Sequence, residues 1–216
     1  MLIFFTKKIN SFNKFSLVNF NQTEGNAYIQ GFMPKLTDIP LECKCPNCSA
    51  VNNFTYHASY KRYISFNIDK EIITYTVNVI RVRCTSCDTT HALLPNFIVP
   101  YTIMSKDSIL SIASSAAKSS VLKTASSLNI TYQLIYSYIA LLLSFFPNID
   151  ILNKLHIYTN NLTQQYYLYN CAELCNMTFC LDYIKYFRRP FLMQKYRNKA
   201  AGPPYIGVAQ EPSLKY

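Results

Sequence analysis

The sequence predicts an α+β fold in which a small β-hairpin near the N-terminus precedes an all-α region. Two segments rich in aromatic and β-branched residues, 53–66 and 72–84, are typical of strands, and the polar segment 67–71 separates them as a turn. Apolar residues then recur at helical spacing after Ser105. We therefore divide the 216 residues into a partly disordered extension (1–40), a hairpin domain (41–101), a helical domain (102–147) and a helical region with a basic tail (148–216).

The second strand segment predicts a β-bulge. Its apolar residues alternate from Ile73 to Val79 and then shift phase to Ile80, Val82 and Cys84. An extra residue inserted into one strand of a pair produces such a slip of one position. We therefore expect a bulge in this strand near Val79 and Ile80.

Two C-x2-C pairs flank the hairpin: Cys45 and Cys48 before it, and Cys84 and Cys87 at its end. Two thiols at this spacing share a tight turn, and two such turns supply the four thiolates that structural Zn²⁺ prefers. A redox pair requires a βαβ setting that neither pair has, and buried free thiols are the remaining alternative. We predict that these four cysteines bind a structural Zn²⁺, which makes the hairpin a zinc ribbon. The ion would supply much of the folding free energy of so small a sheet.

Other residues near the two pairs stay outside the predicted ligand set. Cys43 could replace Cys45 only with altered loop geometry, and His57 and His91 are kept out because a lone histidine is more often structural. Ser49 and Asp88 follow the two pairs at the positions where glycine is usual. Both residue types tolerate turn conformations, so the zinc prediction stands.

The helical domain has the spacing of a helix-turn-helix. Ser105 is a suitable N-cap, and the segment 119–145 divides into two helices at Leu128–Ile130, with Thr131 as the cap of the second. In such a unit the start of the second helix faces the major groove of DNA. A plain helical bundle remains the alternative. The residues that we expect to contact DNA here are Thr131, Tyr132, Gln133, Tyr136 and Ser137.

The segment between Lys123 and Asp150 has no charged residue and is long enough to span a bilayer. Its first half contains serine, asparagine, threonine and glutamine, and Pro147 ends the apolar part. We therefore favour a water-soluble helix over a membrane anchor. Further along, Cys171, Cys175 and Cys180 are interpreted as buried thiols in preference to a second metal site.

The balance of charges indicates a polyanionic partner. The chain has 21 Lys and Arg against 11 Asp and Glu, a formal net charge of +10. Four glycines leave no Gly-rich phosphate loop or dinucleotide motif. The N-terminus places apolar residues before its lysines, the reverse of a secretory signal, so we expect a cytoplasmic protein. Further candidates for phosphate contacts are Arg81, Arg83, Lys185, Arg188 and Arg189.

The run from Arg83 to Tyr101, together with "CPNC" and the helices that follow, resembles an uncharacterised bacterial family. Its members carry a domain of unknown function built on a zinc ribbon and look like the N-terminal DNA-binding part of insertion-sequence transposases. The resemblance covers about residues 43–145. It implies a zinc-ribbon and helix-turn-helix protein of mobile-element origin that binds double-stranded DNA, with Cys45, Cys48, Cys84 and Cys87 at the ligand positions.

We expect a regulator or accessory factor and not an enzyme. The residues after 147 include few acids, among them Asp150, Glu173 and Asp182, and form no recognisable metal-binding triad for DNA cleavage. Two alternatives stay open: a fragment or subunit of an active transposase, and a membrane-anchored zinc-ribbon protein. A homodimer is considered as a further assembly.

Overall fold

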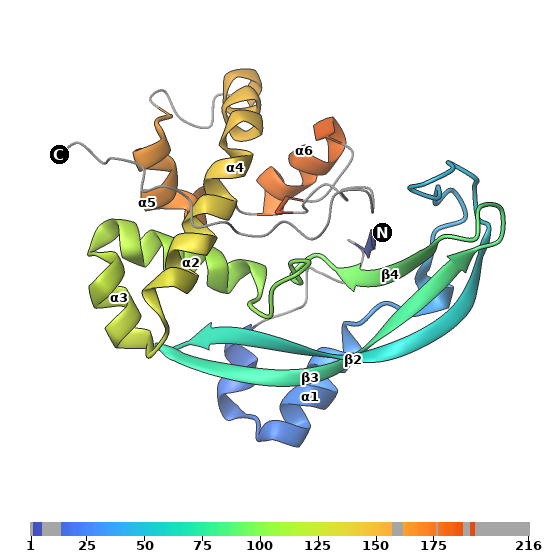
Figure 1. The fold of residues 1–216 in the computed structure, drawn as a ribbon, viewed down its shortest axis with the longest axis horizontal. Coiled ribbons are helices and arrows are strands. Elements are labelled where there is room, and N and C mark those ends of the chain that lie inside the picture. The colour runs from blue at the N-terminus through green and yellow to red at the C-terminus, as the bar shows by residue number, and fades with distance from the viewer. Residues whose placement is uncertain (1, 6–13, 157–161, 176, 188–190, 193–216) are drawn as a thin grey trace.

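A computed structural model describes residues 2–5, 14–156, 162–175, 177–187 and 191–192 (Figure 1). Three antiparallel strands, β2 (Phe54–Ile68), β3 (Glu71–Cys84) and β4 (Thr90–Pro95), carry a cluster of four cysteines at one end. The helices α2 to α6 follow the sheet in the chain. The predicted α+β class is confirmed.

The β2–β3 hairpin is longer than predicted, because its turn is only two residues long. The strands pair from Phe54 opposite Cys84 to Ile68 opposite Glu71. Asp69 and Lys70 make the turn with φ values of 49° and 69°. Two left-handed residues in succession match the twist of the flanking strands, which is why hairpins favour this type of turn.

The predicted β-bulge lies in the other strand. The register of the β2–β3 pair shifts between Tyr56 and Ala58 of β2 and not near Val79. The change of phase in β3 has a different cause. Tyr75, Val77 and Val79 are buried in a cluster with α1 (Gln22–Gly31), whereas Val82 is buried in a second cluster on the opposite face. The hydrophobic pattern therefore changes phase because one face of β3 is buried up to Val79 and the opposite face is buried at Val82.

Two strands were not predicted. The segment Thr90–Pro95 forms β4, which pairs with β3 through Arg81 opposite Ala92 and Val82 opposite His91. On its other side β4 pairs in parallel with β1 (Leu2–Phe5), so the strand order is β1-β4-β3-β2. Because β4 is covered on both faces, its residues from His91 to Pro95 are buried. A continuous apolar run of this length gives no alternation from which a strand can be recognised.

The described residues of the expected N-terminal extension form part of the core. A 3-10 helix (η2, Lys14–Asn19), α1 and a second 3-10 helix (η3, Leu36–Asp38) precede the sheet, and α1 packs beneath it (Figure 1). Leu17, Ile29 and Met33 are buried against Tyr75. The helix approaches closely because it presents Gly25 to the Tyr75 ring, where an added Cβ would lie 2.0 Å from a ring carbon.

The first helices after the sheet are α2 (Lys106–Lys118), α3 (Val121–Leu128) and α4 (Tyr132–His156). The predicted caps of α2 and α4, Ser105 and Thr131, are observed. The Ser105 hydroxyl accepts a hydrogen bond from the amide of Ser108, and Thr131 accepts one from Leu134 at 3.4 Å. The second helix is longer than the predicted segment 119–145, because α4 continues through Pro147 to His156. The boundary that we placed at residue 147 therefore falls inside one helix.

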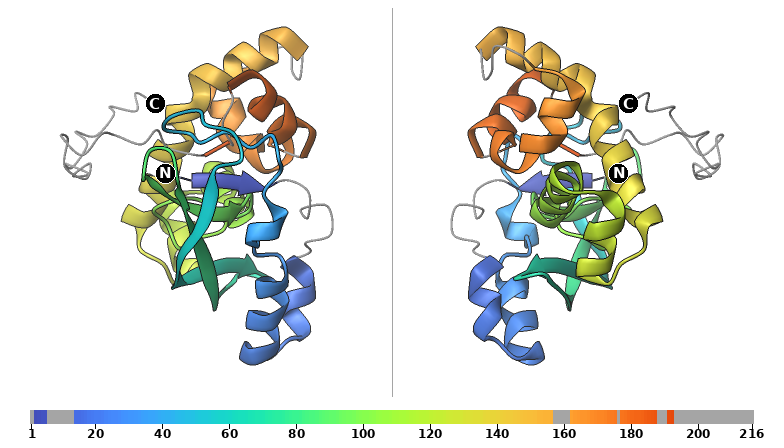
Figure 2. Two further views of the ribbon diagram at one scale, coloured as in Figure 1. Left: turned by 90° about the vertical axis from the view of Figure 1, so that its right-hand side faces the viewer. Right: turned by 90° about the vertical axis from the view of Figure 1, so that its left-hand side faces the viewer.

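The helical core is separate from the core of the sheet. It contains buried residues of α2 to α4 and of α5 (Gln164–Leu174) and α6 (Met177–Phe187), such as Ile112, Leu142 and Tyr183. Figure 2 shows the helices gathered on one side of the sheet and α1 on the other. Backbone bonds of Ser65 to Ile103 (2.7 Å) and to Ser105 (2.9 Å) attach the helices to β2 near the tip of the hairpin.

Candidate functional site

The two C-x2-C turns repeat the same backbone geometry. The amide of Ser49 donates to the carbonyl of Cys45 (2.8 Å), and the amide of Asp88 donates to that of Cys84 (2.9 Å). The amide of Cys45 donates to Ala50 (2.8 Å) and that of Cys84 to Thr89 (3.0 Å). The two turns are therefore equivalent residue by residue, although 39 positions of the chain separate each pair of equivalents.

The residue after each pair adopts a left-handed backbone conformation. Ser49 has a φ of 63° and Asp88 a φ of 62°, in the region that glycine enters most easily. This explains why glycine is usual at both positions and shows that serine and aspartate are accommodated there. Asp88 also forms an ion pair with Arg83 of β3, which fastens the second turn to the strand.

The sulfurs of Cys45, Cys48, Cys84 and Cys87 all lie within 4.8 Å of one another, and we call these residues the four-cysteine cluster. The Sγ atoms of Cys45 and Cys87 are 3.7 Å apart, and those of Cys48 and Cys84 are also 3.7 Å apart. A tetrahedral ion with Zn–S bonds of ~2.3 Å separates its sulfurs by about 3.8 Å. All four cysteines are free of disulfides. The cluster could therefore hold a metal ion such as zinc, and its dimensions fit a zinc site with four thiolate ligands.

The surroundings of the four-cysteine cluster shift the pKa values of its thiols in different directions. Hydrogen bonds from Thr89 and then Asn47 lower the pKa of Cys87 to about 6. The amide of Ala50 opposes the rise at Cys48, but desolvation and the neighbouring thiols raise its pKa to about 12. Burial raises the pKa of Cys45. Without a metal, Cys87 therefore ionises before Cys45 and Cys48.

His91 of β4 lies directly behind the cluster. Its side chain is fully buried, and its Nε2 is 3.4 Å from the Sγ of Cys45. Burial lowers the pKa of His91 to about 4, so the ring is neutral at pH 7 and has one N–H. A thiolate can only accept a hydrogen bond, so that N–H belongs on Nε2 when Cys45 is ionised. Phe54 packs edge-on against the ring at 5.9 Å and holds its orientation.

The remaining cysteines lie outside the four-cysteine cluster. Cys43 is half-buried and its Sγ is 4.0 Å from the carbonyl of Lys44. Cys171, Cys175 and Cys180 are buried in the helical core, as interpreted from the sequence. Among the residues that the structure describes, these three form no group close enough to hold a metal ion.

The residues expected to contact DNA from the helix-turn-helix lie together. Asn129 ends α3 in a left-handed conformation with a φ of 50°, and α4 begins three residues later. Thr131, Tyr132 and Gln133 are exposed in the first turn of α4. Tyr136 is exposed one turn further on, and its ring meets that of Tyr132 edge-on at 6.4 Å. Ser137 is half-buried and donates its hydroxyl to the carbonyl of Leu134 (2.7 Å).

The other residues proposed for phosphate contacts lie elsewhere. Arg81 and Arg83 belong to the end of β3 beside the four-cysteine cluster, and their side chains bind Thr90 and Asp88. Lys185 lies on α6, with its Nζ 5.6 Å from the centre of the Tyr186 ring. Arg188 and Arg189 lie outside the described residues. The predicted set therefore does not form one surface, because the end of β3 lies far from the start of α4. The sequence alone gives no information on this separation.

Figure 1 shows this separation directly. The hairpin tip lies beside the start of α4, and the loops with the four-cysteine cluster lie at the opposite end of the sheet. No curated protein and no solved structure matches the chain. One family model matches, with the description Domain of unknown function (DUF6431), in agreement with the kind of family that the sequence resembles. Over residues 45–130, from the first cysteine of the four-cysteine cluster to the turn before α4, the chain carries a DUF6431 domain of unknown function.

Proposed function

We propose that this chain is a zinc-binding protein that contacts double-stranded DNA through the start of α4. The observation that carries the proposal is the arrangement of α3, the turn 129–131 and α4 on a helical core, with polar and aromatic side chains exposed at the second helix. The recognition helix of a helix-turn-helix presents such side chains to the major groove.

The packing of the three helices supports this role. Each of α2, α3 and α4 contacts the other two, so the turn is supported from behind. Ala125, Leu128 and Ile135 are buried at the joint, and small Ala125 allows close approach. The left-handed Asn129 lets the chain reverse direction within a few residues. The exposed start of α4 is therefore a rigid surface.

The chemistry of this surface also suits DNA. Gln133 can pair with adenine in the major groove, and the hydroxyls of Thr131 and Tyr132 can donate to phosphates. No acidic residue occurs between Asp107 and Asp150, so no carboxylate on α3 or the first half of α4 repels a phosphate. Lys123 on α3 is exposed and adds a positive charge nearby.

The role proposed for zinc is structural. Cys45, Cys48, Cys84 and Cys87 would hold the ion, which would join the two C-x2-C turns and fix the end of the sheet. Four thiolates leave no open coordination position for a substrate. The bond from His91 to Cys45 would orient one ligand and reduce its basicity.

A regulator or accessory factor of mobile-element origin is the biological role that we favour, acting in the cytoplasm. The alternative is a subunit of an active transposase. Incubation of the purified chain with labelled DNA and Mg²⁺ or Mn²⁺ distinguishes them, because strand cleavage would establish the enzyme and intact DNA is expected.

A membrane-anchored protein is a second candidate, because α4 is long and apolar enough to cross a bilayer over Tyr132–Leu155. However, Ile135, Tyr138, Leu142 and Phe145 of α4 are buried at helical spacing in the core. An apolar stripe that packs against neighbouring helices in this way needs no lipid. Cell fractionation tests the point: we expect the chain in the soluble fraction, and recovery with membranes after a salt wash would support the anchor.

Duplex binding is tested by fluorescence anisotropy with a library of labelled duplexes at several salt concentrations. We expect affinity to fall with salt at a log–log slope of about −0.9 for each phosphate contacted. Gln133→Ala should weaken binding to the duplex that the unaltered chain binds most tightly by about 5- to 150-fold. The matched control is Gln165→Ala, at an exposed position of α5, and it should leave duplex affinity unchanged. Absence of duplex affinity at low salt would overturn the proposal, and gel filtration of the same sample tests for the homodimer.

A further inference from the structure

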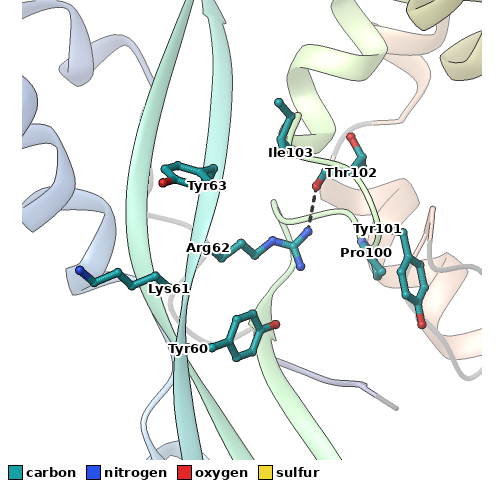
Figure 3. Close-up of a pocket in the computed structure, with 8 residues that line it drawn as sticks. All are labelled: Tyr60, Lys61, Arg62, Tyr63, Pro100, Tyr101, Thr102 and Ile103. Atoms are coloured by element: carbon teal, nitrogen blue, oxygen red, sulfur yellow. Dashed lines mark hydrogen bonds between the residues drawn. The ribbon is translucent and has the colours of Figure 1, made fainter.

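An open hollow lies between the edge strand β2 and the loop that leads into α2 (Figure 3). Its volume is about 450 Å³, and residues 60–63 of β2 and 100–103 of the loop line it. Binding sites for small molecules fall in this size range. The hollow is remote from the four-cysteine cluster and is not part of the exposed surface at the start of α4.

Three of the residues that line the hollow are tyrosines, and all three are exposed to solvent. The exposed fractions are 38% for Tyr60, 61% for Tyr63 and 73% for Tyr101. In Figure 3, the Tyr60 ring lies on the gap side of the strand with Arg62, the Tyr63 ring points to the other side with Lys61, and Tyr101 lies across the gap. Gathered aromatic rings left in water indicate a surface that a ligand covers.

Tyr101 is held in an unfavourable backbone conformation. Its φ is 63°, in the left-handed region that bulky residues rarely adopt. The side chain does not bury in return, because it is the most exposed of the three tyrosines. Strain of this kind is retained where the surrounding structure holds a residue in place, and such residues gather at binding sites.

Arg62 gives the hollow a positive charge and a rigid wall. Its Nη2 donates to the carbonyls of Val99 (2.7 Å) and Thr102 (2.9 Å), which ties the loop to β2. Figure 3 shows the guanidinium directed from the strand into the gap, whereas the Lys61 side chain points away. No carboxylate is among the lining residues, so the charge of Arg62 is not neutralised there.

We propose that this hollow binds an unpaired nucleotide of a single-stranded nucleic acid. The base would stack on the ring of Tyr60 or Tyr101, and Arg62 would face the phosphate. Aromatic stacking beside a basic side chain is how proteins hold single strands of any sequence. Arg62 disfavours a cationic ligand, and the flat rings favour a flat one. The inference does not depend on duplex binding by α4, because the two surfaces are separate.

The experiment uses the full chain with zinc and a fluorescein-labelled 15-nucleotide oligothymidylate. Tyr60→Ser and Tyr101→Ser should each weaken binding about tenfold, a typical loss for one stacking ring. Tyr56→Ser is the matched control, because Tyr56 is 57% exposed on the same strand and does not line the hollow. Arg62→Gln should increase Kd more than Lys70→Gln, which removes an equal charge from the exposed hairpin turn.

Stacking is measured separately with an oligonucleotide that contains 2-aminopurine. Its emission should be quenched on binding to the unaltered chain and not on binding to Tyr101→Ser. Circular dichroism and a zinc assay confirm that each variant is folded. Unchanged affinity and quenching in both tyrosine variants would overturn the inference, as would a chain that binds no single strand. Loss of duplex binding alone in Gln133→Ala, with single-strand affinity intact, would show that the two activities belong to different sites.

Discussion

The Nε2 of His91 lies 3.4 Å from the Sγ of Cys45, so a residue of β4 contacts the sulfur of a candidate metal ligand from within the sheet. Hydrogen bonds to ligands orient them and adjust their affinity for the metal. We predict that His91→Phe lowers zinc affinity by about 10- to 100-fold, measured by competition with a chromogenic chelator. His91→Gln keeps a donor and should lose less. His57→Gln, at an exposed position outside the cluster, should bind zinc normally.

Removal of the metal should loosen one end of the sheet and leave the helices folded. The four-cysteine cluster belongs to the loops around 43–53 and 84–90, whereas α2 to α6 have a core of their own. After treatment with a strong chelator, we expect faster hydrogen exchange in the two loops and unchanged exchange in α2 to α4. Simultaneous loss of protection in α3 and α4 would contradict this separation.

The affinity for zinc should fall as the pH falls. The pKa of Cys48 is raised to about 12 and that of Cys45 is raised, so both thiols hold protons at pH 7 without metal and must release them to bind it. Near pH 7 we expect log affinity to change by at least about two per pH unit, because each of these two thiols releases one proton. The pKa of Cys87 is about 6, so the slope should become steeper by about one below that pH. Titrations with a buffered chelator between pH 5.5 and 8 measure it, and Cys43→Ser should give the same slopes.

Gly25→Ala should destabilise the protein, because the new Cβ would overlap the buried Tyr75 ring. We expect a loss of about 1–3 kcal/mol in the free energy of unfolding, measured with urea. Gly31 in the same helix is the control, since nothing lies within 4 Å of an added Cβ there. Gly31→Ala should be neutral or stabilising by up to about 1 kcal/mol. Equal effects at the two positions would show that the contact with Tyr75 does not determine the packing of α1.

Local signals in the sequence predicted local structure well. The C-x2-C spacing brought four thiols to one place, and the cap at Ser105 and the break at Asn129 correspond to observed helix ends. Each of these features is decided by a few neighbouring residues. The N-cap hydrogen bond of a serine and the left-handed backbone of an asparagine depend only on neighbouring residues.

Features that depend on distant packing were missed. The parallel strand β1 joins β4 across almost 90 residues of chain, and no periodicity in either segment records that pairing. The helix α4 continues through Pro147 because the packing of buried residues on both sides of it outweighs the lost hydrogen bond and the ring clash that a proline causes. Distant packing also explains why the sheet is larger than the small ribbon that we expected. The helix α1 packs on it and forms a hydrophobic core that does not depend on a metal.

The left-handed residues of the chain also have a consequence for engineering. Among the residues that the structure describes, eight other than glycine have positive φ, whereas neither Gly25 nor Gly31 does. Each such residue costs about 1 kcal/mol that glycine would not. At Asp88 the side chain binds Arg83 and so has a use, but Lys70 at the hairpin tip is exposed. Lys70→Gly is thus a direct route to a more heat-stable form of this protein that keeps the four-cysteine cluster and every residue lining the hollow.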